Sequence, residues 1–309
     1  MRVFRELNHL PSFKNSVITI GTFDGVHKGH QKLITRIKLL SKQINGESII
    51  ITFHPHPRIV INPEDKSLRL LNTIDEKIAL LEKYVIDNVV IVPFSRDFSE
   101  QNAEDYIRNF LVNNFQPKYI VIGYDHKFGK DRIGHYNLLE SMKLTFGYEM
   151  EEISEEMLDD IEISSTKIRE ALNKGEVKLA NELLGHNYTL SGKVVRGLQN
   201  GRKLGFPTAN IDVTDEFKLI PKTGIYAVYA YRHGNKYKGM LSIGYNPTFN
   251  GKQQTIEVNI LDFDKDVYGE NITIEFVEYI RDEKKFDSAE ALIAEIKNDE
   301  KKTRSILLA

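Results

Sequence analysis

The chain of 309 residues contains no cysteine, which excludes disulfide bonds, thiolate metal sites and cysteine nucleophiles. It has no apolar run near the ~20 residues that a membrane-spanning helix needs, and residues 1–10 lack the apolar region of a signal peptide. An excess of positive charge is also missing, because 42 Lys and Arg face 44 Asp and Glu for a net charge of −2. These absences argue against a membrane protein and a non-specific nucleic-acid binder, and the length favours a cytoplasmic protein of two domains.

The first half of the sequence alternates between strand and helix patterns. Short apolar runs predict buried strands, and longer segments with apolar residues every three or four positions predict helices. The expected strands are residues 17–20, 48–53, 89–92 and 119–122, and the expected helices are residues 30–44, 78–85 and 103–115. Strands separated by helices predict a parallel sheet with helices on its faces. Ligands of such sheets bind beyond the carboxyl ends of the strands, which directs attention to residues 21–30 and 123–129.

Strand patterns dominate the second half from residue 188 to residue 281, after a short helix expected over residues 177–184. Residues 224–232 and 236–243 flank a Gly-containing turn and predict a hairpin. Further strands are expected at residues 255–261 and 272–280, so the series predicts a small barrel or sandwich. A helix capped by Ser288 is expected over residues 288–297. The change in pattern puts a domain boundary at residues 185–187.

A glycine-rich turn with two histidines follows the first buried strand. Glycines let the backbone turn tightly against a ligand, and the start of the next helix presents free N–H groups to a phosphate. Imidazoles beside that position can donate hydrogen bonds to charge that develops on phosphorus. The segment therefore predicts phosphate chemistry, against the alternatives of ordinary turn histidines or of a metal site for which no third ligand is evident. The candidate residues are Gly21, Phe23, Asp24, Gly25, His27, Gly29 and His30.

A second candidate phosphate site opens the helix that follows residue 163. Ser164, Ser165 and Thr166 supply hydroxyls beside free backbone N–H groups, and Arg169 adds a positive charge. This combination suits a polyphosphate tail. An ordinary helix cap uses the same residue types, and the segment taken alone fits the cap better.

Another glycine-rich segment lies in the second half. Its glycines can wrap phosphates, and the hydroxyl and amide oxygen that follow them are suitable Mg²⁺ ligands. The alternative is a flexible surface loop. Glu257, inside an otherwise apolar strand, is either a solvated outward residue or a functional carboxylate that faces a cleft. The candidate residues of the segment are Gly197, Gly201, Arg202, Gly205, Pro207, Thr208 and Asn210.

Together these motifs resemble those of a known enzyme family. His27-Lys28-Gly29-His30 looks like the HxGH signature of the nucleotidyltransferase superfamily, and residues 163–169 resemble its later phosphate-binding motif. Asp125 lies in a string similar to the motif between them. Residues 197–210 closely resemble the riboflavin kinase signature, with Arg196 where the family often has histidine. In this order the motifs look like those of prokaryotic bifunctional riboflavin kinase/FAD synthetases.

The resemblance implies a fold for each half of the chain. Residues 1–186 would form an α/β FMN adenylyltransferase domain with the Rossmann-like parallel sheet of nucleotidyltransferases. Residues 187–309 would form a riboflavin kinase domain, a small antiparallel β-barrel with a terminal helix. The implied substrates are ATP, riboflavin and FMN.

The resemblance also implies a role for individual side chains. In the kinase step Thr208 and Asn210 would hold Mg²⁺ and Glu257 would act as general base. In the adenylylation step His27 and His30 would stabilise the transition state. The serine, threonine and arginine side chains of residues 164–169 would hold the departing pyrophosphate.

Two other functions share parts of this pattern. A flavin- or nucleotide-sensing binding protein would be free to lose the charged and polar set that this chain keeps. An adenylyltransferase with another acceptor, such as a pyridine nucleotide or pantetheine phosphate, is disfavoured by the attached kinase-like segment. His54 and His56 either lie near the nucleotide or are loop residues fixed by prolines, and the acidic residues of 151–160 are expected to form a solvated loop.

Overall fold

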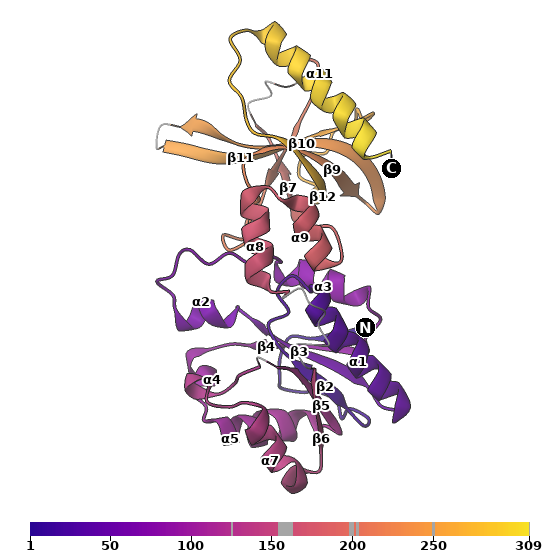
Figure 1. Ribbon diagram of the computed structural model, residues 1–309, viewed down its shortest axis with the longest axis vertical. Helices are drawn as coiled ribbons and strands as arrows, with labels where there is room; N and C mark the ends of the chain where they lie inside the picture. Colours follow the sequence, from indigo (N-terminus) through magenta and orange to yellow (C-terminus); the bar gives the residue numbers. More distant parts are fainter. Residues whose placement is uncertain (125, 154–162, 198–200, 202–203, 249–250, 309) are drawn as a thin grey trace. The chain divides into compact units, whose positions relative to one another are not determined.

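The computed structural model describes residues 1–124, 126–153, 163–197, 201, 204–248 and 251–308. The chain forms two compact units (Figure 1). Unit 1 comprises Met1–Leu68 and Ile74–Ser164, and unit 2 comprises Arg69–Thr73 and Ser165–Ala309. The expected boundary between functional domains, at residues 185–187, stays a prediction.

Unit 1 is built on a six-stranded sheet with the order β1-β4-β3-β2-β5-β6, in which all neighbouring strands are parallel. The strands are β1 (Arg2–Phe4), β2 (Val17–Ile20), β3 (Ser48–His54), β4 (Asn88–Pro93), β5 (Tyr119–Gly123) and β6 (Glu149–Ile153). The four expected strands are confirmed as β2 to β5. The chain runs outward from the middle of the sheet in both directions, so β2 and β5 flank its topological switch point.

Helices cover both faces of this sheet, as the alternation of strands and helices predicts. In β3 the side chains of Ile49 and Ile51 enter one core and that of Ile50 enters the other, because successive strand residues point to opposite faces. The core with Ile50 is closed by α1 (Lys28–Gln43) and α3 (Ile74–Glu82). The opposite core is closed by α5 (Ala103–Asp105), the π-helix Tyr106–Val112, α6 (Asn113–Phe115) and α7 (Tyr136–Phe146). Shorter helices are α2 (Pro57–Ile61), α4 (Arg96–Ser99) and the 3-10 turn Lys130–Arg132.

Unit 2 contains a closed barrel, which decides between the barrel and the sandwich. Its strand order is β10-β11-β8-β7-β12-β9, and each neighbouring pair is antiparallel. The strands are β7 (Thr189–Val195), β8 (Ala209–Asp212), β9 (Gly224–Arg232), β10 (Asn235–Thr248), β11 (Gly251–Ile260) and β12 (Asn271–Arg281). The expected hairpin joins β9 to β10 through His233 and Gly234, both with positive φ, as tight hairpin turns require.

Helices and one distant segment complete the part of unit 2 that the structure describes. The helices are α8 (Ser165–Lys174), α9 (Val177–Leu184) and α11 (Ala289–Ile306). Ser288 caps α11 as expected, because its Oγ accepts a hydrogen bond from the N–H of Ala291 at 3.1 Å. The segment Arg69–Thr73, which we call the strap, is fixed by the Lys218 ammonium, which donates to the Leu71 carbonyl at 2.7 Å.

One expectation is wrong in part. Glu151 and Glu152 do not lie in a solvated loop but in β6, the edge strand beside β5. The carboxylate of Glu151 is neutralised there by Arg36 on α1, whose Nη2 donates to it at 2.6 Å. The rest of the acidic stretch, residues 154–160, lies outside the described residues. Within the described part of the chain, no helix has both the length and the apolar character needed to cross a membrane.

Candidate active sites

The glycine-rich turn leaves β2 at the switch point of the sheet. Its start is fixed by the N–H of Gly21, which donates to the Ile51 carbonyl at 3.0 Å. Three residues then have positive φ: Phe23 at 49°, Gly25 at 85° and Val26 at 42°. Only glycine adopts this conformation without strain, and a β-branched residue there is a true outlier. Strain of this kind persists only where surrounding contacts hold it, and it concentrates at functional sites.

The two histidines of the turn stack on each other at the start of α1. Their ring centroids are 3.7 Å apart, with an angle of 18° between the ring planes. His27 caps the helix, because its Nδ1 accepts a hydrogen bond from the N–H of His30 at 3.4 Å. The proton of a neutral His27 ring therefore lies on Nε2. The sequence prediction of two imidazoles at a helix N-terminus is confirmed.

The surroundings of His30 favour its neutral form. Burial lowers its pKa well below the ordinary value of 6.5, and the neighbouring His27 and Lys77 lower it further. Its Nδ1 atom is buried and has no hydrogen-bond partner among the described residues. A neutral imidazole with an unpaired ring nitrogen, at the positive end of a helix, is suited to interact with a developing negative charge.

The remaining residues predicted for this chemistry fall into two sets. Asp24 and Gly29 are buried beside the histidines in unit 1. Ser164 is the last residue of unit 1, whereas Ser165 and Thr166 begin α8 of unit 2. Arg169 also lies on α8, where its Nε donates to the Arg69 carbonyl of the strap at 2.6 Å. Asp125 lies outside the described residues.

In the barrel, the predicted metal ligands and base lie together. The Thr208 hydroxyl donates to Oε2 of Glu257 at 3.0 Å. Asn210 on β8 is the direct register partner of Glu257 on β11, and such partners point to the same side of a sheet. Their neighbours Ala209 and Val258 are buried in the barrel. Because strand residues alternate, Asn210 and Glu257 face away from the barrel interior, where Glu257 lies in one polar cluster with Thr208 and Asn210.

The glycine-rich segment approaches this cluster at Gly197. A Cβ on Gly197 would lie 2.3 Å from Nδ2 of Asn210, so a larger residue here would displace the amide or the backbone. Gly201 accepts backbone hydrogen bonds from Leu204 at 3.1 Å and Phe206 at 2.8 Å. Gly205 has a φ of 86°, and the Pro207 carbonyl accepts from the Asn259 amide at 2.7 Å. Arg202 lies outside the described residues, and Arg196 lies over the ring of Tyr268.

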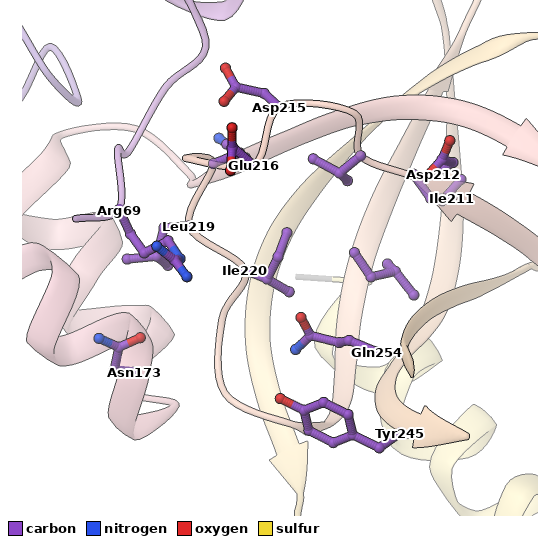
Figure 2. Close-up of a pocket in the computed structure, with 13 residues that line it drawn as sticks. Arg69, Asn173, Ile211, Asp212, Asp215, Glu216, Leu219, Ile220, Tyr245 and Gln254 are labelled. Carbon is purple, nitrogen blue, oxygen red and sulfur yellow. The ribbon is translucent and has the colours of Figure 1, made fainter. Parts of the chain in front are cut away.

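Unit 2 also contains a cavity of about 420 Å³ that the sequence does not predict. Ile211 and Ile256 line it, and each is the strand neighbour of a residue in the Thr208–Asn210–Glu257 cluster. The cavity and that cluster therefore lie on opposite faces of the barrel wall. Figure 2 shows the register partners Tyr245 and Gln254 on one side of the cavity. The other side is formed by acidic residues of the β8–β9 connection and by Arg69 of the strap.

Sequence reasoning missed Lys77 on α3, whose ammonium donates to the Thr22 carbonyl at 2.6 Å. The sequence does contain a signal for it: Lys77 is a charged residue on the apolar face of its helix, between Ile74 and Leu81. His56 caps a helix, and a contact with the nucleotide stays a prediction. Its Nδ1 caps α2 by accepting from the N–H of Arg58 at 3.2 Å.

Comparisons with known proteins match both units. The FAD synthetase family model matches residues 10–167, and the riboflavin kinase family model matches residues 184–307. A Listeria monocytogenes protein named bifunctional riboflavin kinase/FMN adenylyltransferase is 39% identical over 293 residues, which are 94% of this chain and 92% of the relative. An Escherichia coli protein of the same name is 34% identical and covers 97% of this chain, with 96% of its own length covered.

A solved structure from Streptococcus pneumoniae resembles the whole chain. It is described as a macrolide-efflux protein, with a TM-score of 0.87, 32% identity and 98% of each chain covered. Its overall likeness extends across both units and not only across one.

Proposed function

Since the chain belongs to the family of bifunctional riboflavin kinase/FMN adenylyltransferases, we propose how its two groups of side chains divide the reactions of that family. The enzyme phosphorylates riboflavin to FMN in its C-terminal part and adenylylates FMN to FAD in its N-terminal part. One observation carries the assignment of residues. The histidine pair lies within unit 1, and the Thr208–Asn210–Glu257 cluster lies within unit 2.

In the kinase step the ribityl hydroxyl of riboflavin attacks the γ-phosphorus of ATP. Glu257 accepts the hydroxyl proton, the bond between the γ-phosphorus and the bridging oxygen breaks, and ADP leaves with the electron pair. The Thr208 hydroxyl holds the Glu257 carboxylate through their 3.0 Å hydrogen bond. Phosphoryl transfer depends mainly on positioning and electrostatics, so a base fixed in this way suits the reaction. Gly197, Gly201 and Gly205 of the glycine-rich segment supply backbone N–H groups to the phosphates.

Mg²⁺ is part of the proposal because the donor set fits it. Thr208 and Asn210 offer a hydroxyl and an amide oxygen, which are hard neutral donors, and both lie beside the Glu257 carboxylate. Mg²⁺ usually binds through few protein groups together with phosphate oxygens and water. When bound, the ion offsets negative charge on the phosphates of ATP. Thr208 and Asn210 are its proposed protein ligands.

In the adenylylation step a phosphate oxygen of FMN attacks the α-phosphorus of a second ATP. The bond from the α-phosphorus to the bridging oxygen breaks, and pyrophosphate leaves with the electron pair. FMN phosphate is already an anion and is itself the nucleophile. His27 and His30 donate hydrogen bonds to the oxygens on which charge accumulates, beside the positive end of α1. The turn residues Gly21, Phe23, Asp24, Gly25 and Gly29 form the nucleotide pocket.

The departing pyrophosphate is assigned to a different part of the chain. The hydroxyls of Ser164, Ser165 and Thr166 at the start of α8, with the guanidinium of Arg169, bind its oxygens.

We also propose that the functional domains divide between residues 186 and 187. A cytoplasmic location completes the proposal, because both steps consume ATP.

The test incubates the purified protein with riboflavin, ATP and Mg²⁺ and separates the flavins by chromatography. FMN and then FAD are expected. Supplying FMN in place of riboflavin isolates the second step, so that each variant is assayed for the two reactions separately. The assignment of residues is wrong if folded variants of Glu257 and of His30 each lose both reactions.

A further inference from the structure

Lys77 is a buried cation that the two proposed mechanisms do not use. Its side chain is only 6% exposed, although lysine is almost never buried unless it is paired. It lies on α3, on the face of the sheet that also carries α1 and its histidines. Removing a charged group from water is costly, so a lysine kept here calls for a compensating role.

The contacts of Lys77 converge on one carbonyl of the glycine-rich turn. Its Nζ donates to the Thr22 carbonyl at 2.6 Å and lies 3.4 Å from Oγ1 of Thr52 on β3. The Thr52 hydroxyl donates to the same carbonyl at 3.1 Å. Thr22 therefore joins the turn to α3 and β3, one residue before the strained conformation begins at Phe23.

The charge of Lys77 also acts on the residues that the turn carries. Its positive charge lowers the pKa of His30, after the larger effect of burial and that of His27. Burial lowers the pKa of Lys77 itself to about 8, and the nearby carboxylate of Asp24 opposes that shift. The charges of Asp24 from the turn and of His30 from α1 thus interact with that of the ammonium, and β3 presents the Thr52 hydroxyl to it.

We propose that Lys77 is a positioning residue for adenylyl transfer, which holds the turn through the Thr22 carbonyl. Its positive charge also favours the neutral form of His30. It does not touch the substrate. It keeps the strained turn in the one conformation that directs both histidines toward the phosphorus. The inference rests on the proposed function of unit 1, because it assumes that His27 and His30 act on the phosphorus.

The first experiment measures kcat and KM for FMN adenylylation, and riboflavin phosphorylation on the same protein. Lys77→Gln keeps a hydrogen-bond donor without the charge, Lys77→Met removes both, and Lys83→Met changes an exposed lysine near the end of the same helix. Small misplacements of catalytic groups cost about 10- to 100-fold in rate, so both Lys77 variants are expected to lose that much kcat for adenylylation. Their phosphorylation of riboflavin should be unchanged, and K83M should be unchanged in both.

The second experiment separates charge from scaffolding by titrating His30 in ¹³C-histidine-labelled protein by NMR. Without the ammonium, the pKa of His30 should rise in K77Q. Thr52→Val removes the other donor to the Thr22 carbonyl but changes no charge, so its His30 titration should stay at the wild-type position. A residue that only supports the fold would not produce this difference.

Several outcomes would overturn the proposal. One is a wild-type kcat for adenylylation in folded K77Q, and another is a pKa of His30 in K77Q that equals the wild-type value. A third is loss of the near-UV circular dichroism signal in both Lys77 variants, which would show that Lys77 has only a structural role. His30→Ala distinguishes the two levels of the argument. If H30A adenylylates normally, the proposed function of unit 1 fails; if H30A is inactive and K77Q is normal, only the role of Lys77 fails.

Discussion

The hydroxyl of Thr208 donates a hydrogen bond to the carboxylate of Glu257 over 3.0 Å, across 49 positions of sequence. One residue is a proposed metal ligand and the other the proposed base, and the hydrogen bond places both side chains in one cluster. The bond also orients the carboxylate, which leaves its remaining lone pairs for a proton from the substrate. The predictions below begin from this pair.

We expect Glu257→Gln to abolish riboflavin phosphorylation and to leave the conversion of supplied FMN to FAD intact. An amide keeps the size of the side chain but accepts no proton, and loss of a general base costs about 10²- to 10⁴-fold in rate. Initial rates of both steps, measured by flavin chromatography, check this. Glu290→Gln, an exposed change in the first turn of α11, is the matched control and should alter neither rate. Normal phosphorylation by E257Q would remove Glu257 from the mechanism.

His30→Ala should have the reverse effect. Loss of one donor to a developing anion costs about 10²- to 10³-fold in kcat, so FAD formation from FMN should fall by that factor while FMN formation continues. His135 is an exposed histidine of the same unit, and its replacement by alanine supplies the control. An equal loss in H30A and H135A would show that the stacked pair has no special part in the reaction.

Gly197→Ala tests the close approach of the loop to Asn210. The new Cβ would lie 2.3 Å from Nδ2 of Asn210, so either the loop or the amide must move. We expect riboflavin phosphorylation to fall by about 10- to 100-fold, because a displaced ligand misplaces the nucleotide. The same preparation should still make FAD from FMN, which serves as the internal control. An unchanged kcat and an unchanged KM for ATP in G197A would contradict this geometry.

The ion pair between Arg281 and Asp299 should dominate the charge contribution to the stability of the barrel. Asp299 accepts from Nη2 of Arg281 at 2.6 Å, and the two side chains are only 12% and 2% exposed. Asp299→Asn removes the nearer and more buried partner of Arg281 and leaves Glu295, 3.4 Å from its Nε, as the remaining one. The free energy of unfolding should therefore fall by up to about 3–5 kcal/mol, the range for a broken buried pair. Chemical denaturation measures the change.

Asp262→Asn is the control for that measurement. It breaks a bidentate pair with Arg304 that has the same chemistry, but the Asp262 side chain is 74% exposed. Exposed pairs contribute little to stability. If D262N and D299N destabilise the protein equally, burial is not the reason for the strength of the Arg281 pair.

The sequence predicts those parts of the fold whose signal is local. The apolar runs of β2 to β5 are recognisable because central parallel strands are buried on both faces. The sequence does not predict the edge strand β6, because Glu149, Glu151 and Glu152 give it the composition of a solvated segment. Its place depends on neighbours such as Arg36, which is 115 positions away.

Site residues can likewise be predicted from the sequence only where the signal is local. The motifs predict His27, His30, Thr208 and Glu257, because each lies in a glycine-rich string or stands out in an apolar strand. Lys77 has no such string around it. Its hydrogen bonds with Thr22 and Thr52 join separate elements of the fold, so they form only in the folded chain.

The strap has a practical consequence for separating the two activities. A fragment that begins at residue 187 would contain the barrel strands and the Lys218 ammonium but not the Leu71 carbonyl that accepts its hydrogen bond. It would also lack the Leu70 backbone, which exchanges hydrogen bonds with Phe217 and Leu219 at 2.6 and 2.8 Å. A single cut in the chain therefore cannot free the barrel unit with all its parts. Silencing one site by a point substitution in the full-length protein isolates the other reaction more faithfully than dissection does.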